Sequence, residues 1–138
     1  MTAVEFDALI DTLPNGLHDS DLVSLTLDLA ASEVLCIIDV DLSDPSDPAT
    51  EGRSRRTRIV FAGVSFVAID PPGLDLSATL SGWMDAGSGQ PSTAPRADLE
   101  APEDGFLAWI FLNSANGFIR IGARHASMAW HGETRQAT

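Results

Sequence analysis

Residues 17–42, LHDSDLVSLTLDLAASEVLCIIDVDL, carry the strongest structural pattern in this 138-residue chain. Aliphatic residues take every second position in its first half and polar residues lie between them, which is typical of a strand with one buried face. The second half repeats this alternation after a short Ala-Ala-Ser segment, so we predict a β-hairpin. The inward side chains are expected to face each other in four pairs: Leu29 with Val34, Leu27 with Cys36, Leu25 with Ile38, and Val23 with Val40.

A third antiparallel strand is predicted from Arg56 to Phe61, after a polar loop at residues 43–54. Its apolar residues alternate with basic ones, whereas the strand before it alternates aliphatic with acidic residues. Apolar pairs on one face and opposite charges on the other therefore favour the same register. The expected pairs are Val40 with Thr57, Ile38 with Ile59 and Cys36 with Phe61 inside, and Asp41 with Arg56 and Asp39 with Arg58 outside.

An amphipathic helix is predicted from Thr2 to Leu13, because its apolar residues share one broad face and Pro14 follows directly. After the third strand, Gly63 indicates a bulge or a tight bend. Two further elements are expected, a strand at residues 64–70 and either a short helix or an edge strand at residues 74–84.

The last third of the chain is predicted to be β-structure around a tight turn. Residues 106–112 are apolar at every position, which is typical of a strand covered on both faces. Asn116 and Gly117 form the dipeptide that most favours a hairpin turn. The remaining expected segments are strands at residues 118–124 and 126–130, a flexible loop at residues 85–105 and a polar tail at residues 132–138.

These elements predict one α+β domain over residues 1–138, predominantly antiparallel β. We expect a single meandering sheet, curled into a sandwich-like half-barrel, with one N-terminal helix and flexible loops at residues 43–54 and 85–105. The length suits a single hydrophobic core. The single cysteine, Cys36, excludes an internal disulfide and is expected to be a small core side chain.

The composition is strongly acidic, with a formal net charge of −12 and no lysine. Such a charge repels nucleic acid and anionic membranes, so neither is expected as a partner, whereas a basic protein would be attracted. No secretory signal and no apolar stretch long enough to span a membrane is recognisable. The expected location is the cytoplasm.

Few polar residues are arranged for chemistry. His18, Asp19 and Asp21 could bind a metal or exchange protons, but they lack a second ligand cluster, and capping of the start of a strand explains them equally. The acidic run from Asp39 to Glu51 departs from the EF-hand pattern at its glycine and its final glutamate. We therefore predict no catalytic residue, no metal and no cofactor, and a protein that is not an enzyme.

Aromatic and arginine residues near the C-terminus are a second set of candidates. Most of the aromatic side chains are expected in the core. If one face of the last hairpin were uncovered, however, it would expose a rigid apolar patch rimmed by arginines, which is the composition of a protein interface. The candidate protein-binding residues are Trp109, Phe111, Arg120, Arg124 and Trp130.

Several strand and turn residues carry a resemblance: Leu17-His18-Asp19, Phe61 with Gly63-Val64, Asp70-Pro71-Pro72, and an Asn-rich turn before Phe118-Ile119-Arg120-Ile121 and Trp130. In these the chain resembles a group of small uncharacterised bacterial proteins and is loosely similar to acidic immunity proteins of toxin systems. The resemblance implies a fold and a bacterial setting, and it carries over no catalytic residue.

The function expected from these features is that of a non-enzymatic binding protein, an immunity-type inhibitor whose partner is a basic protein such as a toxin. Electrostatic complementarity would speed that association. Two alternatives stay open at this point. One is a structural subunit of a homo-oligomer, for example a homodimer, and the other is an enzyme that uses a small ligand or a metal.

Overall fold

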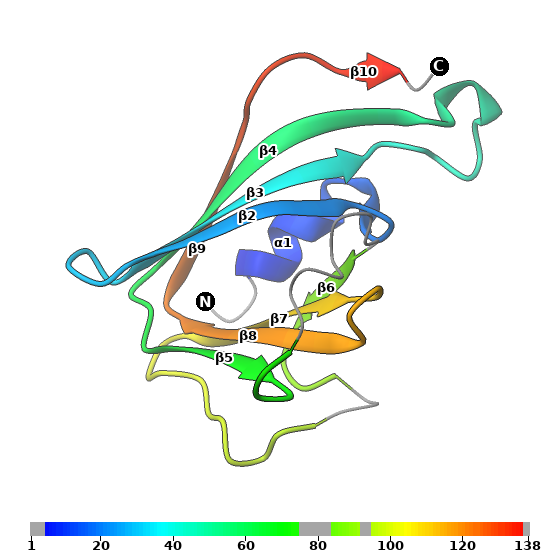
Figure 1. Ribbon diagram of the computed structural model, residues 1–138. Helices are drawn as coiled ribbons and strands as arrows, with labels where there is room; N and C mark the ends of the chain where they lie inside the picture. The colour runs from blue at the N-terminus through cyan, green and yellow to red at the C-terminus, as the bar shows by residue number, and fades with distance from the viewer. Residues whose placement is uncertain (1–4, 75–83, 92–94, 137–138) are drawn as a thin grey trace.

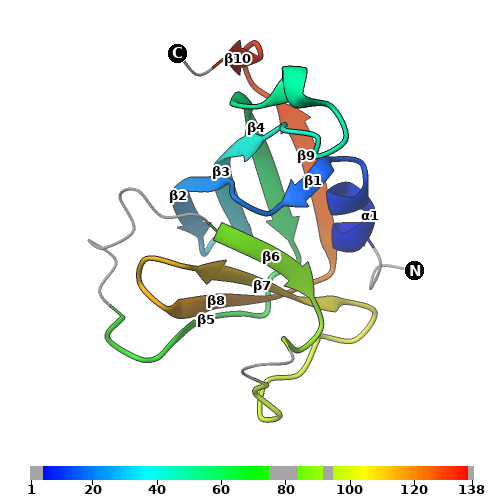
Figure 2. The same cartoon turned by 90° about the vertical axis from the view of Figure 1, so that its right-hand side faces the viewer.

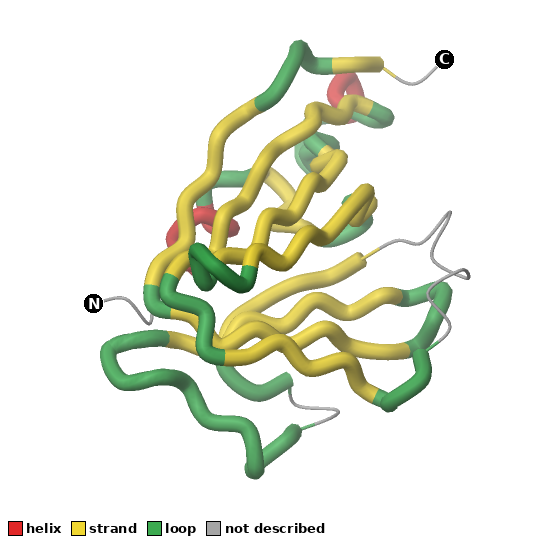
Figure 3. The backbone as a smooth tube through the Cα atoms, turned by 60° about the vertical axis from the view of Figure 1, so that its left-hand side comes forward, coloured by secondary structure: helices red, strands yellow, loops and turns green. Residues whose placement is uncertain are grey.

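The structure is a computed structural model that describes residues 5–74, 84–91 and 95–136. In these ranges the chain forms two antiparallel sheets that join along one corner and diverge from it (Figures 1 and 3). The first sheet contains β2 (Asp21–Asp28), β3 (Glu33–Asp41), β4 (Arg53–Ala62), β9 (His125–Trp130) and β10 (Arg135–Gln136), with both β9 and β10 paired to β4. The second has the order β5 (Phe66–Asp70), β8 (Gly117–Ala123), β7 (Phe106–Leu112) and β6 (Met84–Ser88).

Two chain segments pass from one sheet to the other at the corner. β4 continues into β5 through Gly63, and β8 continues into β9 through Arg124. The backbone pairing is carried around the corner, because Arg124 N donates to Ala62 O (3.0 Å) and Ser65 N donates to Gly122 O (2.8 Å). Gly63 has a φ of 62°, and a Cβ there would lie 3.0 Å from the Arg124 Cβ. The bend predicted at Gly63 is therefore a turn that a side chain would strain.

The helix α1 (Glu5–Asp11) and the short strand β1 (Pro14–Leu17) close one side of the two sheets. Figure 2 shows α1 beside β9 of the first sheet and near β6 of the second, and it makes contacts with both. Phe6 anchors the helix in the core, with its ring centroid 5.2 Å from that of Phe61 and 6.3 Å from that of Phe106. The η2 helix (Pro48–Thr50) lies in the loop between β3 and β4.

The predicted class, predominantly antiparallel β with one N-terminal helix, is confirmed, and the strands are divided between two sheets that do not close into a barrel. The core lies between the sheets. Cys36 is fully buried in it, and burial raises the pKa of its thiol to about 12. The other side chains with at most 1% exposure include Phe6, Leu17, Val34, Ile38, Val40, Ile59, Phe61, Ile110 and Ile121.

The predicted registers of the first sheet are wrong by two residues between β3 and β4 and from Ser24 to Asp28 of β2, and by three residues before the bulge, where Leu22 pairs with Ile38. Leu25 pairs with Cys36 rather than Ile38, and Cys36 pairs with Ile59 rather than Phe61. A displacement of two residues keeps every side chain on the same face, so the alternation alone could not distinguish these registers. On the outer face the shift leaves one ion pair, Asp39 with Arg56, instead of the two that were predicted.

Three aliphatic residues of the first hairpin are exposed rather than buried as predicted. Val23 is 46%, Leu27 is 45% and Leu29 is 80% exposed. A bulge between Leu22 and Ser24 shifts the start of β2, and residues 29–32 form the turn. These side chains lie along the edge of the first sheet, where no described strand covers them.

Three predicted loop boundaries also need correction. Residues 85–88 belong to β6, where Gly87 lies under the Trp109 ring, so a glycine there is required by packing rather than by flexibility. The loop predicted at residues 43–54 ends at residue 52, because β4 begins at Arg53. The predicted tail contributes β10, which pairs with β4 through Arg135 and Gln136. Most of the segment predicted at residues 74–84 lies outside the described residues.

Candidate functional site

A groove lies between the edges of the two sheets, on the side away from α1. β2 forms one wall and β5 the other, since each is the last strand of its sheet. Two adjoining hollows share Val67 and make up the groove, with volumes of about 220 and 200 Å³. The first is lined by Leu22, Val23, Ser24, Leu25, Val67, Ile69, Leu112 and Ile119, and the second by Leu27, Leu29, Ser32, Val64, Ser65, Phe66 and Val67.

The lining of this β2–β5 groove is mainly apolar, with Ser24, Ser32 and Ser65 as its polar residues. Leu112 and Ile119, which are 3% and 5% exposed, belong to the core and form its floor. Among the described residues, the large hydrophobic side chains that are exposed all lie along it: Val23, Leu27, Leu29 and Ile69. Exposed apolar side chains gathered in one place mark an interaction surface more often than scattered ones do.

Backbone hydrogen bonds join the two sides of the groove at each of its ends. At the corner end, Val64 N donates to Ser32 O at 2.9 Å. At the other end, Ser20 and Met84 form a β-bridge, in which Met84 N donates to Ser20 O at 2.8 Å. Ser20 is 1% exposed, and its hydroxyl oxygen accepts from Asp41 N at 3.0 Å. β2 is thus tied to the second sheet at both ends and separated from it in between.

The outer edge of β2 also presents backbone groups. From Ser24 to Asp28 the strand pairs with β3 without a bulge, and it contains neither proline nor lysine. Leu42 N donates to Arg53 O, so the backbone N–H and C=O groups of Leu42 point toward β4. Because the direction of these groups alternates from one residue to the next, Ser24 and Thr26 are residues of β2 whose backbone groups point toward β3. The N–H and C=O groups of Leu25 and Leu27 therefore point toward the open edge.

Carboxylates stand at both ends of the groove, although none of the described residues that line it is charged. Asp21 begins β2 and Asp28 ends it. Asp21 lies opposite Asp39, and burial together with the charge of Asp39 raises the pKa of Asp21. Asp39 itself has a lowered pKa, because Arg56 donates hydrogen bonds to both of its oxygens at 2.8 and 3.0 Å.

The predicted polar candidates lie near one end of this groove, and the structure brings only part of them together. His18 lies 3.5 Å from a carboxylate oxygen of Asp19 and 3.8 Å from one of Asp85, a residue of β6. Asp21 faces Asp39 instead. Within the described residues, no group of three or more His, Cys, Asp or Glu side chains is placed to hold a metal ion.

The predicted aromatic and arginine candidates occupy three separate places. Trp109 and Phe111 are half-buried on the outer face of β7, with their rings 6.0 and 4.9 Å from that of Phe118. Arg120 is 3% exposed, lies over the Phe118 ring at 4.7 Å and forms an ion pair with Asp70 at 3.2 Å. It therefore cannot be an exposed rim of a patch.

The other two candidates of this set lie outside that aromatic face. Arg124 is exposed at the corner between the sheets, and Trp130 is half-buried on β9 with the Arg55 guanidinium 4.9 Å from its ring centroid. The five predicted residues do not form one patch.

The loop before β7 contacts the outer face of the second sheet. Arg96 forms ion pairs with Asp70 (3.4 Å) and Asp98 (2.7 Å), and its hydrogen bonds lower the pKa of Asp98 to about 2. The Gln90 side chain also bonds the backbone of Arg96 on both its N–H and its C=O. These contacts attach the described part of the loop to β5.

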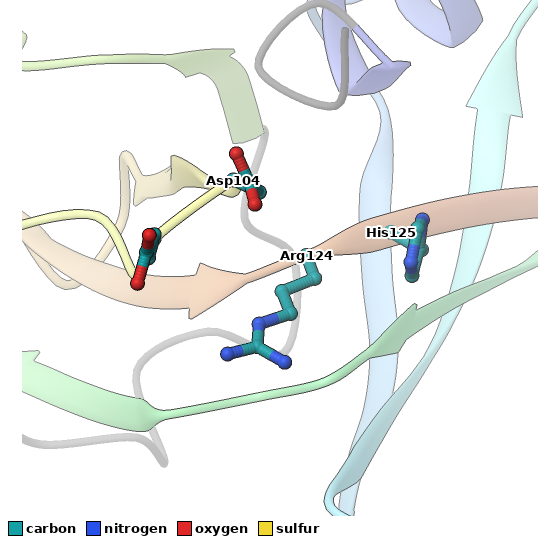
Figure 4. Close-up of a pocket in the computed structure, with 4 residues that line it drawn as sticks. Asp104, Arg124 and His125 are labelled. Atoms are coloured by element: carbon teal, nitrogen blue, oxygen red, sulfur yellow. The ribbon is translucent and has the colours of Figure 1, made fainter.

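A polar hollow of about 390 Å³ lies at the corner and is lined by Glu103, Asp104, Arg124 and His125 (Figure 4). All four residues are exposed. Charges of both signs face this hollow, and none of its four lining residues is a serine, threonine or cysteine. It is less suited to a specific ligand than the groove, because all of its lining residues are exposed and charges in water interact weakly.

Comparison of the sequence with models of known protein families found no match, and comparison with curated proteins found none either. Among the described residues, no helix is both long and apolar enough to cross a membrane. The geometry and charge of the groove are therefore the features that bear on function.

Sequence reasoning missed the groove because it assigned Val23, Leu27 and Leu29 to the core. Alternation reports which side chains share a face, and an edge strand beside an open groove has the same pattern as a central strand. Ile69 gave no separate signal, since it lies in an ordinary short strand. No feature of the sequence alone placed β2 and β5 on the same side of the molecule.

Proposed function

We propose that the protein is a non-enzymatic binding domain that holds a basic protein partner in the β2–β5 groove, in the manner of an immunity-type inhibitor. The observation that carries this proposal is the apolar groove itself, which exposes Val23, Leu27 and Ile69 between carboxylates. A partner that covered it would bury these side chains and bring its own cationic groups to Asp21 and Asp28. The absence of lysine and the net charge of −12 favour a basic partner over an acidic one.

We further propose that binding takes place in the cytoplasm. A single unpaired and buried cysteine such as Cys36 is typical of proteins that fold in a reducing compartment.

The test begins with affinity capture from the source lysate, using the full chain and two variants that each add a carboxylate. Leu27→Asp places the new charge in the groove, and Ala129→Asp places it on an exposed position of β9. Because the added charge is the same, a difference between the variants reports the location rather than the charge. The captured protein is then purified and its affinity is measured directly.

We expect the captured protein to be basic, to bind the wild type and Ala129→Asp alike, and to bind Leu27→Asp at least about tenfold more weakly, as a central apolar contact would require. Its association rate should fall steeply with added salt. A partner that bound all three proteins equally would contradict the proposal. Loss with Phe111→Ser in place of Leu27→Asp would also contradict it, and would move the interface to the outer face of β7.

A homo-oligomer is the second candidate, because two copies could pair through the exposed edges of β2. Charge disfavours it, since each copy carries a net charge of −12 and the carboxylates Asp21 and Asp28 would approach their counterparts. Sedimentation at micromolar concentration decides between them. A dimer that Leu27→Asp dissociates would support the oligomer and count against the basic partner.

A further inference from the structure

We infer that the partner enters the groove as an extended segment that adds an antiparallel strand to β2, with apolar side chains at every second position and basic side chains between them. This inference rests on the proposed function and specifies how the partner is recognised. It follows from three features of the open side: the outer backbone edge of β2, which pairs with no other described strand, the spacing of the hollows and the position of the acidic residues.

The backbone of β2 is suited to accept a strand. Leu25 and Leu27 direct their N–H and C=O groups to the open edge, over a stretch without a bulge. Natural edge strands are commonly protected by proline, lysine, a bulge or a covering element, and from Ser24 to Asp28 this edge has none of the first three. Addition of a strand would satisfy these groups with hydrogen bonds, as in other domains that bind extended peptides.

The hollows fit the side chains of such a strand. They lie in succession along β2, the first beside Leu22 and Leu25 and the second beside Leu27 and Leu29, and they share Val67. Side chains on one face of a strand recur about every 6.6 Å, because each residue advances about 3.3 Å. Alternate apolar side chains of an added strand would therefore enter consecutive hollows, while the residues between them face outward.

The carboxylates beside the groove favour basic residues at the outward positions of the added strand. Ser24, Thr26 and Asp28 lie on the outward face of β2, and Asp21 stands at its start. In the part of the chain that the structure describes, no basic residue lines the groove or belongs to β2 or β5. Lysine or arginine at the outward positions of the added strand would face these acceptors and carboxylates, whereas acidic residues would be repelled.

The antiparallel geometry makes a prediction about individual amides. Residues opposite Leu25 and Leu27 in an antiparallel pair would exchange both hydrogen bonds with them and would share their inward face. The amides that bond β2 are therefore those of the apolar residues of the added strand. The amides of the basic residues would point away from β2.

The experiment uses a short end-blocked peptide in which valine and lysine alternate, labelled for fluorescence anisotropy with the full chain. Two derivatives carry N-methyl groups, one on the valine amides and the other on the lysine amides. A third peptide replaces lysine by glutamate. The parent peptide and the lysine-methylated peptide should bind, the valine-methylated peptide should bind at least about tenfold more weakly because it loses two or more hydrogen bonds, and the glutamate peptide should not bind.

Leu27→Asp and Ala129→Asp are again the matched protein variants, and only Leu27→Asp should weaken the peptide. Equal binding of the two methylated peptides would overturn strand addition, and so would greater weakening on methylation of the lysine amides. Either result alongside a captured basic partner that still requires Leu27 would leave the proposed function intact and remove only this inference. If neither peptide nor captured protein responds to Leu27→Asp, both proposals fail.

Discussion

The two sides of the molecule where the edges of its sheets approach each other differ in what covers them. Where β9 and β6 approach each other, α1 fills the gap, and Phe6 packs against Phe61 and Phe106. Where β2 and β5 approach each other, the described residues include no covering element, and Leu27 and Ile69 are exposed. The same kind of aliphatic and aromatic side chain therefore stabilises the fold on one side and remains available on the other.

This difference separates stability from recognition. Burial of a large apolar side chain contributes roughly 1.5 to 3 kcal/mol to folding, whereas a side chain left half-exposed keeps much of that free energy for a later contact. The closed side should therefore dominate unfolding experiments and the open side should dominate binding experiments.

The largest effect is expected from Phe6→Ala on the closed side. Phe6 is 1% exposed and contacts two other rings, so its removal should lower the free energy of unfolding by about 3 to 5 kcal/mol. Urea unfolding followed by tryptophan fluorescence measures this value. A loss below about 1 kcal/mol would mean that α1 contributes little to the core and that the two sides do not differ as described.

A smaller loss is expected from Ser20→Ala, which removes an anchor at the end of the open side. The Ser20 hydroxyl oxygen accepts a hydrogen bond from the part-buried backbone N–H of Asp41. Its removal would leave that N–H without this partner, at a cost of about 1 to 3 kcal/mol. Ser24→Ala, on the exposed face of β2, is the control and should change stability by under about 0.5 kcal/mol. Similar values for the two variants would show that this anchor does not hold β2.

Acid should weaken the first sheet through Asp39. Its folded-state pKa lies below the ordinary value of 3.8, so the carboxylate contributes stability above that pH and loses it as the pH falls through the lower folded value. Asp39→Asn should be less stable than the wild type at pH 7, and the difference should shrink as the pH falls below about 4. Asp21 has a raised pKa, so Asp21→Asn should instead stabilise the protein slightly at neutral pH. Chemical unfolding at several pH values measures both, and a difference for Asp39→Asn that is independent of pH would contradict the assignment.

The smallest effect on folding is expected from Leu27→Thr on the open side. Leu27 is 45% exposed and threonine is favoured in strands, so the free energy of unfolding should change by about 0.5 kcal/mol or less. Binding of a dye that reports exposed apolar surface should decrease with this variant. A stability loss comparable to that of Phe6→Ala would show that Leu27 is part of the core, which would remove the distinction between the two sides.

The fold could be predicted from the sequence to the extent that it depends on local pattern. Alternation identified β2, β3 and β4, and the Asn116-Gly117 turn located the β7–β8 hairpin. The registers could not be predicted, because a shift of two residues preserves both faces and leaves charge pairs available, as Asp39 with Arg56 demonstrates. β6 was missed because Gly87 and its small polar neighbours resemble a loop until the Trp109 ring is placed over them.

The candidate site was less accessible to sequence reasoning than the fold. The groove exists because β4 and β8 each cross the corner, which brings β5 to the side of β2 from a distant part of the chain. The charge of the expected partner came from composition alone. The proposed binding surface could be recognised only from the topology. Composition had instead marked Trp109, Phe111 and Arg120, and it could not show that Arg120 is buried in contact with its partners.

Hydrogen–deuterium exchange of the full chain, with and without the captured basic partner, reports at individual amides where the partner binds. We expect slower exchange at β2 and β5, with the amides of Leu25 and Leu27 most affected, and unchanged exchange in α1, β6 and β9. Protection confined to α1 and β9, or to the outer face of β7 around Trp109, would contradict the assignment of the open groove as the binding site.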